Sequence, residues 1–383
     1  MPFALYALAL AAFAVGTTEF IIAGLLPTMA ADLGVSIPAT GLLVTGYALG
    51  VAIGGPILAL MTSHWPRRTV TIAMVALYAA GHVLCAVAPN YTVLLIARVL
   101  VALTHGLFFG NATIAAASVV GPERSGAAIS IVLAGVPLAN LLGVPFGAVI
   151  GHAFGWRSTF WIIAGISALA AVLIALTLPK VEEDNAAPVP WREQLRVLAR
   201  HQISLSYAAL FVLLIGLLTF NTFQVPFLIE RTGVTEGNTP AFLFAYGAGA
   251  VIGIFAGGRL ADWKLMPSML GSIAAYTILS AVILVVQGSP VGMFIAMLLM
   301  GIGVCVFQVQ PQARIVANAA GAPTLAATFI ATAFNLGYAA GALAGAGLLS
   351  AGFGYVSLPV VGIVCGLIAL AVSWWSWRLD KPA

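Results

Sequence analysis

Long apolar runs follow one another along almost the whole chain of 383 residues. A helix needs about 20 apolar residues to cross a bilayer core about 30 Å thick. Runs of this length predict twelve membrane-spanning helices, joined mostly by short turns rich in Pro, Gly and Asn. The predicted spans are 3–31, 39–62, 69–88, 91–118, 126–152, 158–178, 203–229, 241–261, 268–288, 290–317, 324–350 and 355–377.

Composition excludes the main water-soluble alternatives. Hydrophobic residues make up 62% of the chain and charged residues 7%, whereas soluble domains carry about 25% charged residues. This small number of charged residues cannot cover the surface of a water-soluble protein. The composition therefore excludes a soluble enzyme, a disordered chain and a nucleic-acid binder. Because lipid admits only helices and closed barrels, we expect an all-α membrane protein.

The Lys and Arg residues indicate the orientation of the chain. Cytoplasmic loops of membrane proteins carry an excess of these residues. With the N-terminus inside, the external side holds Arg157 and Arg231, Arg98 lies within a span, and all other basic residues fall on the cytoplasmic side. We therefore expect a multi-pass protein of the bacterial cytoplasmic (inner) membrane with both termini in the cytoplasm.

One connection, 179–202, is much longer than the others. It contains three prolines and an acidic patch, and in its last part, 191–200, apolar residues fall on one helical face and arginines on another. This pattern predicts an amphipathic helix at the inner membrane surface. The connection divides the chain into an N-terminal six-helix bundle (1–180), a cytoplasmic linker (181–202) and a C-terminal six-helix bundle (203–383).

The two halves match in sequence at one constant offset. Pro27 corresponds to Pro226, and the segment 154–158 (Phe-Gly-Trp-Arg-Ser) corresponds to 353–357 (Phe-Gly-Tyr-Val-Ser). Ser63 corresponds in the same way to Asp262. One offset at three separate places indicates a parallel duplication, so we expect two pseudo-symmetric bundles with the substrate site between them near the membrane midplane.

Loop motifs of the two halves resemble a known family. The segment 258–262 (Gly-Arg-Leu-Ala-Asp) resembles a loop motif of the major facilitator superfamily. The first copy of this motif ends in Arg67 and Arg68 but has Ser63 where the family has aspartate.

Further motifs resemble the twelve-span drug:proton antiporter branch of that family. They are Arg98 in span four, 139–147 in span five, 16–20 (Gly-Thr-Thr-Glu-Phe) and 335–337 (Asn-Leu-Gly). The last two resemble the subgroup of sugar-efflux, arabinose-efflux and chloramphenicol-efflux proteins. The resemblance covers nearly the whole chain and implies the major facilitator fold and efflux driven by inward proton flow. It leaves the substrate open.

Glu19 is the single acid of span one and the first candidate for proton coupling. A charged side chain inside a membrane costs at least about 2.5 kcal/mol and therefore needs a partner or a function. At 1.5 Å per residue, Glu19 lies about 22 Å and Arg98 about 18 Å from the inner edge. We expect the two to pair and to exchange a proton for substrate. The alternatives are a neutral, hydrogen-bonded carboxyl and a purely structural ion pair.

His105 shares a face of span four with Arg98 and Phe109, at helical spacing. It is the third candidate for proton coupling, as a relay or a substrate contact. A neutral hydrogen bond between helices is the alternative. His82 in span three is interpreted as packing.

Neutral polar groups with aromatic neighbours suit an uncharged polar ligand, although each amide alone commonly joins helices. The substrate-binding candidates are Tyr47, Phe109, Asn140, Asn221, Gln224, Tyr246, Asn335 and Tyr338. We expect the glycines and prolines of span five, together with the loop motifs, to move when the two bundles rock against each other. The gating candidates are Ser63, Arg67, Arg68, Asp262, Gly143, Pro145 and Gly147.

The residue inventory contains no enzymatic set, metal-ligand cluster or phosphate loop, so we expect a protein that is not an enzyme and that uses no cofactor or metal. The expected partners are protons, a small neutral or weakly charged substrate and the lipid bilayer, with no nucleic acid, and the chain is expected to act as a monomer. Proton-linked or uncoupled uptake is the main alternative to efflux. A membrane sensor is less favoured, because even the longest inner connection, 179–202, is short for a signalling segment.

Overall fold

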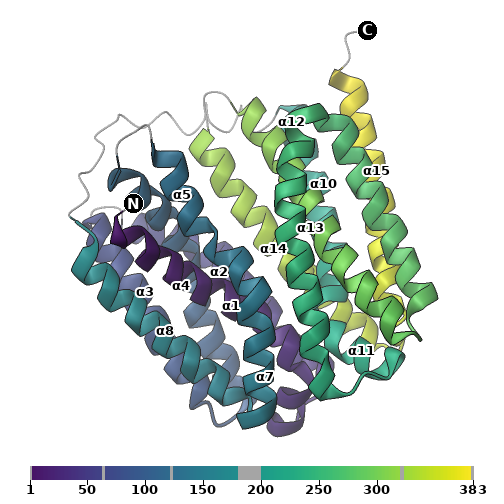
Figure 1. The fold of residues 1–383 in the computed structure, drawn as a ribbon, viewed down its shortest axis with the longest axis horizontal. Helices are drawn as coiled ribbons and strands as arrows, with labels where there is room; N and C mark the ends of the chain where they lie inside the picture. The colour runs from purple at the N-terminus through teal and green to yellow at the C-terminus, as the bar shows by residue number, and fades with distance from the viewer. Residues whose placement is uncertain (1, 63–64, 121–123, 180–199, 320–322, 381–383) are drawn as a thin grey trace. The chain divides into compact units, whose positions relative to one another are not determined.

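In the computed structural model the described residues are 2–62, 65–120, 124–179, 200–319 and 323–380. Within these ranges the chain is helical and contains no strand, which agrees with the predicted all-α class. The chain forms two compact units, residues 1–185 and 186–383 (Figure 1). Ser63 and all but the last residue of the predicted surface helix 191–200 lie outside the described residues.

The N-terminal unit, drawn from purple to teal in Figure 1, contains six membrane-spanning segments. Its fifth segment is broken into four consecutive helical pieces, α5 to α7. The elements are α1 (Phe3–Leu33), α2 (Ile37–Met61), α3 (Arg67–Ala86), α4 (Tyr91–Ser118), α5 (Ser125–Leu133), α6 (Gly135–Leu138), the π-helix η2 (Ala139–Gly143), α7 (Val144–Phe154) and α8 (Trp156–Thr177).

The C-terminal unit, drawn from green to yellow, follows the same order of spans. Its elements are α10 (His201–Thr222), α11 (Gln224–Thr232), the short 3-10 helix η3 (Glu236–Asn238), α12 (Thr239–Val286), α13 (Pro290–Asn318), α14 (Pro323–Ser350) and α15 (Ser357–Asp380).

Eleven helices of the described chain are long and apolar enough to cross a membrane, one fewer than the twelve predicted spans. The difference lies in α12, which has 48 residues and would extend about 72 Å if straight, more than twice the thickness of the membrane core. Lys264 breaks it with the non-helical angles φ −153° and ψ 91°, three residues before Pro267. The element therefore corresponds to the two predicted spans 241–261 and 268–288.

The duplication is visible in the backbone of the loops. Gly34 ends α1 and Gly233 ends α11 at the same sequence offset, and both adopt left-handed angles (φ +63° and +72°). Such angles strain a residue that carries a Cβ atom. The next residue then donates to a carbonyl of the helix over 3.1 Å in both units, Val35 to Ala30 and Val234 to Leu228.

The repeated segments 154–158 and 353–357 also share one turn. Gly155 and Gly354 both have positive φ, +85° and +71°. The serine three residues later donates its hydroxyl to the glycine carbonyl, over 2.6 Å in the first unit and 2.7 Å in the second. The helix caps Asn90 and Ser289 lie at the same offset, and each side chain accepts a backbone N–H at the start of α4 or α13. The same sequence devices therefore build both units.

Span five packs closely against α1 of the same unit. A Cβ atom added at Gly143 would collide with Thr17, and one added at Gly147 would lie 2.8 Å from Ile21. Pro145 lies between these two glycines, in the first turn of α7 and directly after the π-helical turn η2. Gly143 and Gly147 thus belong to a row of glycines, with Gly135 and Gly151, along which span five packs closely against α1.

Candidate functional site

Arg98 is the centre of a polar cluster in the N-terminal unit. It lies in α4, and its side chain is fully buried (0% exposed). Its Nη1 atom donates to the backbone carbonyl of Thr18 over 3.1 Å, and its guanidinium carbon lies 4.1 Å from the centre of the Tyr47 ring. Its Nε and Nη2 atoms have no hydrogen-bond partner among the described residues. One nitrogen of the guanidinium group is therefore hydrogen-bonded, whereas the other two have no partner in the described chain.

Glu19 follows Thr18 in α1, so the structure brings it to the buried arginine. The two side chains attract each other electrostatically. No ion pair within 4.0 Å joins them, although the structure describes both, and Glu19 is partly exposed. An ionised Glu19 would balance the charge of Arg98, whereas a protonated Glu19 would leave that charge uncompensated.

Tyr47 connects Arg98 to His105. The Tyr47 hydroxyl and His105 Nδ1 lie 2.9 Å apart and are both buried, on α2 and α4. Phe109 packs against the His105 ring with centroids 5.3 Å apart. These three predicted residues therefore form one contiguous group around Arg98, in which Tyr47 contributes both its ring face and its hydroxyl.

One part of this cluster was not among the predicted site residues. His82, interpreted as packing, has no exposed surface, and its Nε2 atom lies 2.5 Å from the hydroxyl of Thr18. Tyr78, on the same side of α3, packs against the His82 ring at 4.4 Å between centroids. The signal available in the sequence was their spacing of four residues, which places both side chains on one face of a helix.

The C-terminal unit presents a neutral set of polar groups. Asn221 Nδ2 donates to the Tyr246 hydroxyl over 2.7 Å. Gln224 is buried (4% exposed), and its Oε1 atom has no partner among the described residues. Asn335 donates to the Ala331 carbonyl of its own helix, and its Oδ1 atom likewise has no partner in the described chain. Unsatisfied acceptors in buried positions favour a ligand that donates hydrogen bonds.

Two further candidates are Tyr338 and Asn140. Tyr338 is buried in α14 and packs edge-on against Phe334, with centroids 6.2 Å apart. Asn140 is partly exposed in the π-helical turn η2. The structure thus groups Asn221 with Tyr246 but leaves Asn140 on a separate element of the other unit.

The predicted gating residues that the structure describes differ in their contacts. Arg68 donates to the carbonyls of Ala175 and Leu178, over 2.6 Å and 2.7 Å, at the carboxyl end of α8, where a cation is favoured by the helix dipole. Arg67 is partly exposed, and Asp262 is exposed near the break of α12.

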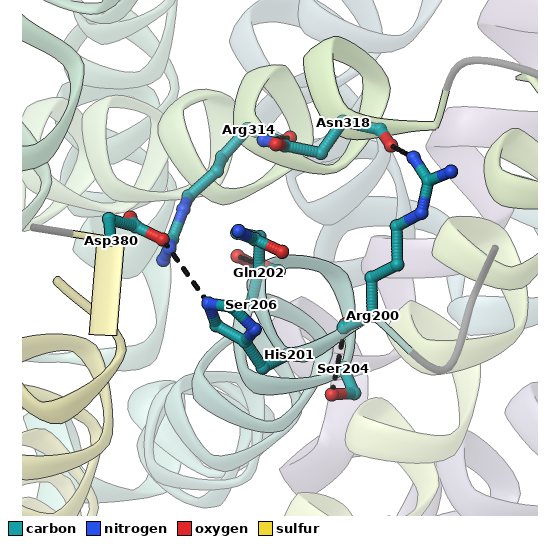
Figure 2. A network of polar contacts seen from close by, with 8 residues as sticks. All are labelled: Arg200, His201, Gln202, Ser204, Ser206, Arg314, Asn318 and Asp380. Carbon is teal, nitrogen blue, oxygen red and sulfur yellow. Dashed lines mark hydrogen bonds and ion pairs between the residues drawn. The ribbon is translucent and has the colours of Figure 1, made fainter. Parts of the chain in front are cut away.

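A second buried arginine, Arg314, lies near the end of α13 and is 2% exposed. Its position in the sequence predicted only a basic residue on the cytoplasmic side. Its Nη2 atom lies 2.6 Å from Asp380 Oδ2 at the end of α15, and His201 at the start of α10 lies 3.5 Å from the other carboxylate oxygen. Figure 2 shows these three side chains meeting, with Arg200 donating to the Asn318 carbonyl beside them.

No group of three or more His, Cys, Asp or Glu side chains that is able to hold a metal ion occurs among the described residues.

Comparison with known proteins gives the same architecture. Residues 8–322 match the model of the Major Facilitator Superfamily. The chain is 38% identical over 374 residues to the inner membrane transport protein YdhP of Escherichia coli strain K12, covering 96% of this chain and 94% of that protein. It is 32% identical to a chloramphenicol resistance protein of Streptomyces lividans, covering 90% and 89% of the two chains.

A solved structure shares the fold. It is a bacterial homologue of the human lysosomal transporter Spinster in an inward-facing, occupied conformation. The TM-score is 0.76 at 22% identity, over 99% of this chain and 98% of that one. The matching family model, the length of the similarity and the duplicated helical units agree, and the chain belongs to the Major Facilitator Superfamily of membrane transporters, which are not enzymes.

Proposed function

We propose that this transporter exports a small neutral or weakly charged compound in exchange for protons. It would act across the bacterial cytoplasmic (inner) membrane, with both termini in the cytoplasm, as the distribution of Lys and Arg favours. The single observation that carries the exchange is a fully buried Arg98 with unsatisfied donors beside a carboxyl that does not contact it directly. Such a pair has two arrangements, which differ by one proton.

The proposed cycle uses these two arrangements. An ionised Glu19 compensates Arg98, and a proton arriving from outside neutralises the carboxyl. Arg98 then has to find other acceptors in an apolar environment, which changes the packing of α1 against α4 and lowers the affinity for cargo. After cargo leaves, the transporter turns inward, Glu19 releases its proton to the cytoplasm and cargo binds again. Linkage requires cargo to weaken proton binding by the same free energy by which a proton weakens cargo binding.

The neutral groups of the C-terminal unit support an uncharged or weakly charged cargo. The unpaired acceptors of Gln224 and Asn335 favour hydroxyl or amine donors. Glu19 is the acid that lies well inside a span of the described chain, so a multivalent cation would lack partners. Export of a neutral cargo would then carry net charge with each proton and respond to membrane voltage as well as to pH.

The relatives support efflux without fixing the cargo. One is named as a chloramphenicol resistance protein. Thermal-shift screening of the purified protein against sugars, nucleosides and phenicol antibiotics should identify a cargo, because a ligand of the folded state raises the apparent stability. The compound that stabilises most then serves in the transport experiment.

The test compares wild type with Glu19→Gln in proteoliposomes under an imposed pH gradient. We expect wild type to move the identified cargo against its gradient and Glu19→Gln to lose this response. Asp32→Asn is the matched control, because Asp32 is an acid of the same helix that is paired with Arg157 instead. Persistent pH-driven transport by Glu19→Gln would contradict the proposal. Cargo movement in the direction of proton flow would show uptake instead of efflux.

A further inference from the structure

Besides its packing contacts, His82 contacts the hydroxyl of Thr18, whose backbone carbonyl accepts a hydrogen bond from Arg98. We call Arg98 and Glu19 together the exchange site. His82 lies in α3, while Thr18 and Arg98 lie in α1 and α4, so the contact joins three helices. All three side chains have 0% exposure. The His82 ring packs between Tyr78 at 4.4 Å and Phe160 at 6.1 Å, which fixes its plane.

The contacts of His82 assign its protons. Nδ1 lies 2.7 Å from the Tyr78 carbonyl oxygen, and a carbonyl only accepts hydrogen bonds. Nδ1 therefore carries the proton, and Nε2 of the neutral ring accepts one. The Thr18 hydroxyl, 2.5 Å from Nε2, is the donor. This arrangement fixes both the rotamer of Thr18 and the direction in which its hydroxyl points.

Thr18 in turn holds the two groups of the exchange site. Its backbone carbonyl accepts from Arg98 Nη1 over 3.1 Å, and the next residue of α1 is Glu19. We propose that His82 is a positioning residue for proton exchange: by holding Thr18 it keeps this stretch of α1 at the place where Arg98 and Glu19 face each other. The inference rests on the proposed function, and it adds a residue to which the exchange cycle above assigned no role.

The effect of His82 on Glu19 would be exerted through the position of Thr18. The charged groups nearest to it are Arg98 on α4 and Glu19, which adjoins its partner Thr18 on α1. Tyr78 on α3 is a neutral phenol, and α8 contributes the uncharged Phe160. A His82 variant that loosens Thr18 would let Arg98 move away from Glu19. The ionised form of Glu19 would then lose support relative to the protonated form.

Labelling of Glu19 by dicyclohexylcarbodiimide tests the inference without a cargo. This reagent modifies protonated carboxyl groups in apolar surroundings, and mass spectrometry of peptides gives the labelled fraction at Glu19 as a function of pH. In the purified full-length protein, we expect His82→Leu to move the pH of half-labelling upward by about one pH unit. Thr18→Val, which is nearly isosteric, should produce the same shift, and the double variant should add nothing further.

Two variants separate positioning from general stability. His82→Gln places an amide oxygen within reach of Thr18 and should restore most of the wild-type midpoint. Thr277→Val removes a buried threonine hydroxyl whose one partner in the described chain lies within its own helix, the Ile273 carbonyl at 2.8 Å. It should leave the midpoint unchanged even if it lowers the melting temperature.

The outcomes distinguish the two claims. If Glu19 titrates in wild type and both His82→Leu and Thr18→Val keep the wild-type midpoint, the positioning role is overturned. The proposed exchange then remains intact. A wild-type Glu19 that is not labelled at any pH between about 5 and 9, the range over which a proton carrier has to titrate, would overturn the proposed exchange, and the positioning role with it. If His82→Leu fails to fold, Thr18→Val decides the result alone.

Discussion

Tyr47 and Tyr246 lie at corresponding places in the two duplicated units, yet they have different neighbours. Tyr47 lies against the guanidinium of Arg98 and contacts His105. Tyr246 accepts a hydrogen bond from Asn221, and no charge contacts it among the described residues. The duplicated scaffold therefore holds a charged cluster in one unit and a neutral one in the other. Under the proposed function, the first unit binds the proton and the second contributes the groups that bind cargo.

The two buried arginines, Arg98 and Arg314, give the largest expected difference between the units. Arg98 has two nitrogens without a partner in the described chain and no ion pair within 4.0 Å, whereas Arg314 has one such nitrogen and pairs with Asp380 at 2.6 Å. We expect Arg98→Met to reduce proton-driven transport about 100-fold, because the loss of about 3 kcal/mol of charge compensation keeps Glu19 protonated. Its melting temperature should change little.

Arg314→Met should show the opposite balance. Removal of one partner leaves Asp380 without its closest cation. Because the Asp380 side chain is 26% exposed, we expect a loss of about 2 kcal/mol of stability, less than for a fully buried pair. Thermal unfolding in detergent and transport in proteoliposomes measure both variants. Equal effects of the two substitutions on transport would contradict the division of roles.

Tyr47 and Tyr246, which occupy corresponding positions in the two units, allow a smaller, matched test. Tyr47→Phe and Tyr246→Phe each remove one buried hydroxyl and keep the ring. Each lost hydrogen bond is worth about 1 kcal/mol, or roughly fivefold in an affinity or a rate. We expect Tyr246→Phe to raise the KM for cargo and Tyr47→Phe to change the pH dependence of transport at nearly constant KM. Exchange of these two outcomes would reverse the assignment of the units.

The smallest effect is expected where the two units are alike. Gly155 and Gly354 occupy the same turn with positive φ, and a Cβ atom at either position would meet nothing within 4 Å. Alanine at each should therefore cost only backbone strain, about 1 kcal/mol. We expect equal decreases in melting temperature and no change in transport. Unequal decreases would indicate that the two turns differ in their contribution to stability.

The fold was largely predictable from the sequence, because membrane helices are marked by their length and apolarity. The constant offset between the halves also predicted the two similar units, and it reappears in the glycine turns at Gly155 and Gly354. The break within α12 was harder to place, since the chain there remains helical on both sides of Lys264. Span boundaries depend on such local angles, which hydropathy does not contain.

The candidate site was predictable only in part. Depth arithmetic along spans one and four placed Glu19 near Arg98, and the structure brings them within electrostatic reach. The contact between Thr18 and His82 was not predictable, because it depends on which helix faces lie opposite each other. A lone histidine in an apolar span carries no signal of its partner.

The pairing of Arg314 with Asp380 also bears on how this protein is best handled in the laboratory. Asp380 is the last described residue of the chain, at the end of α15. Truncation before Asp380 would leave the buried guanidinium of Arg314 without its carboxylate partner and would remove this contact of the final span. Purification tags and fluorescent reporters therefore belong downstream of this aspartate, and a trimmed version would report on a damaged bundle instead of on the native transporter.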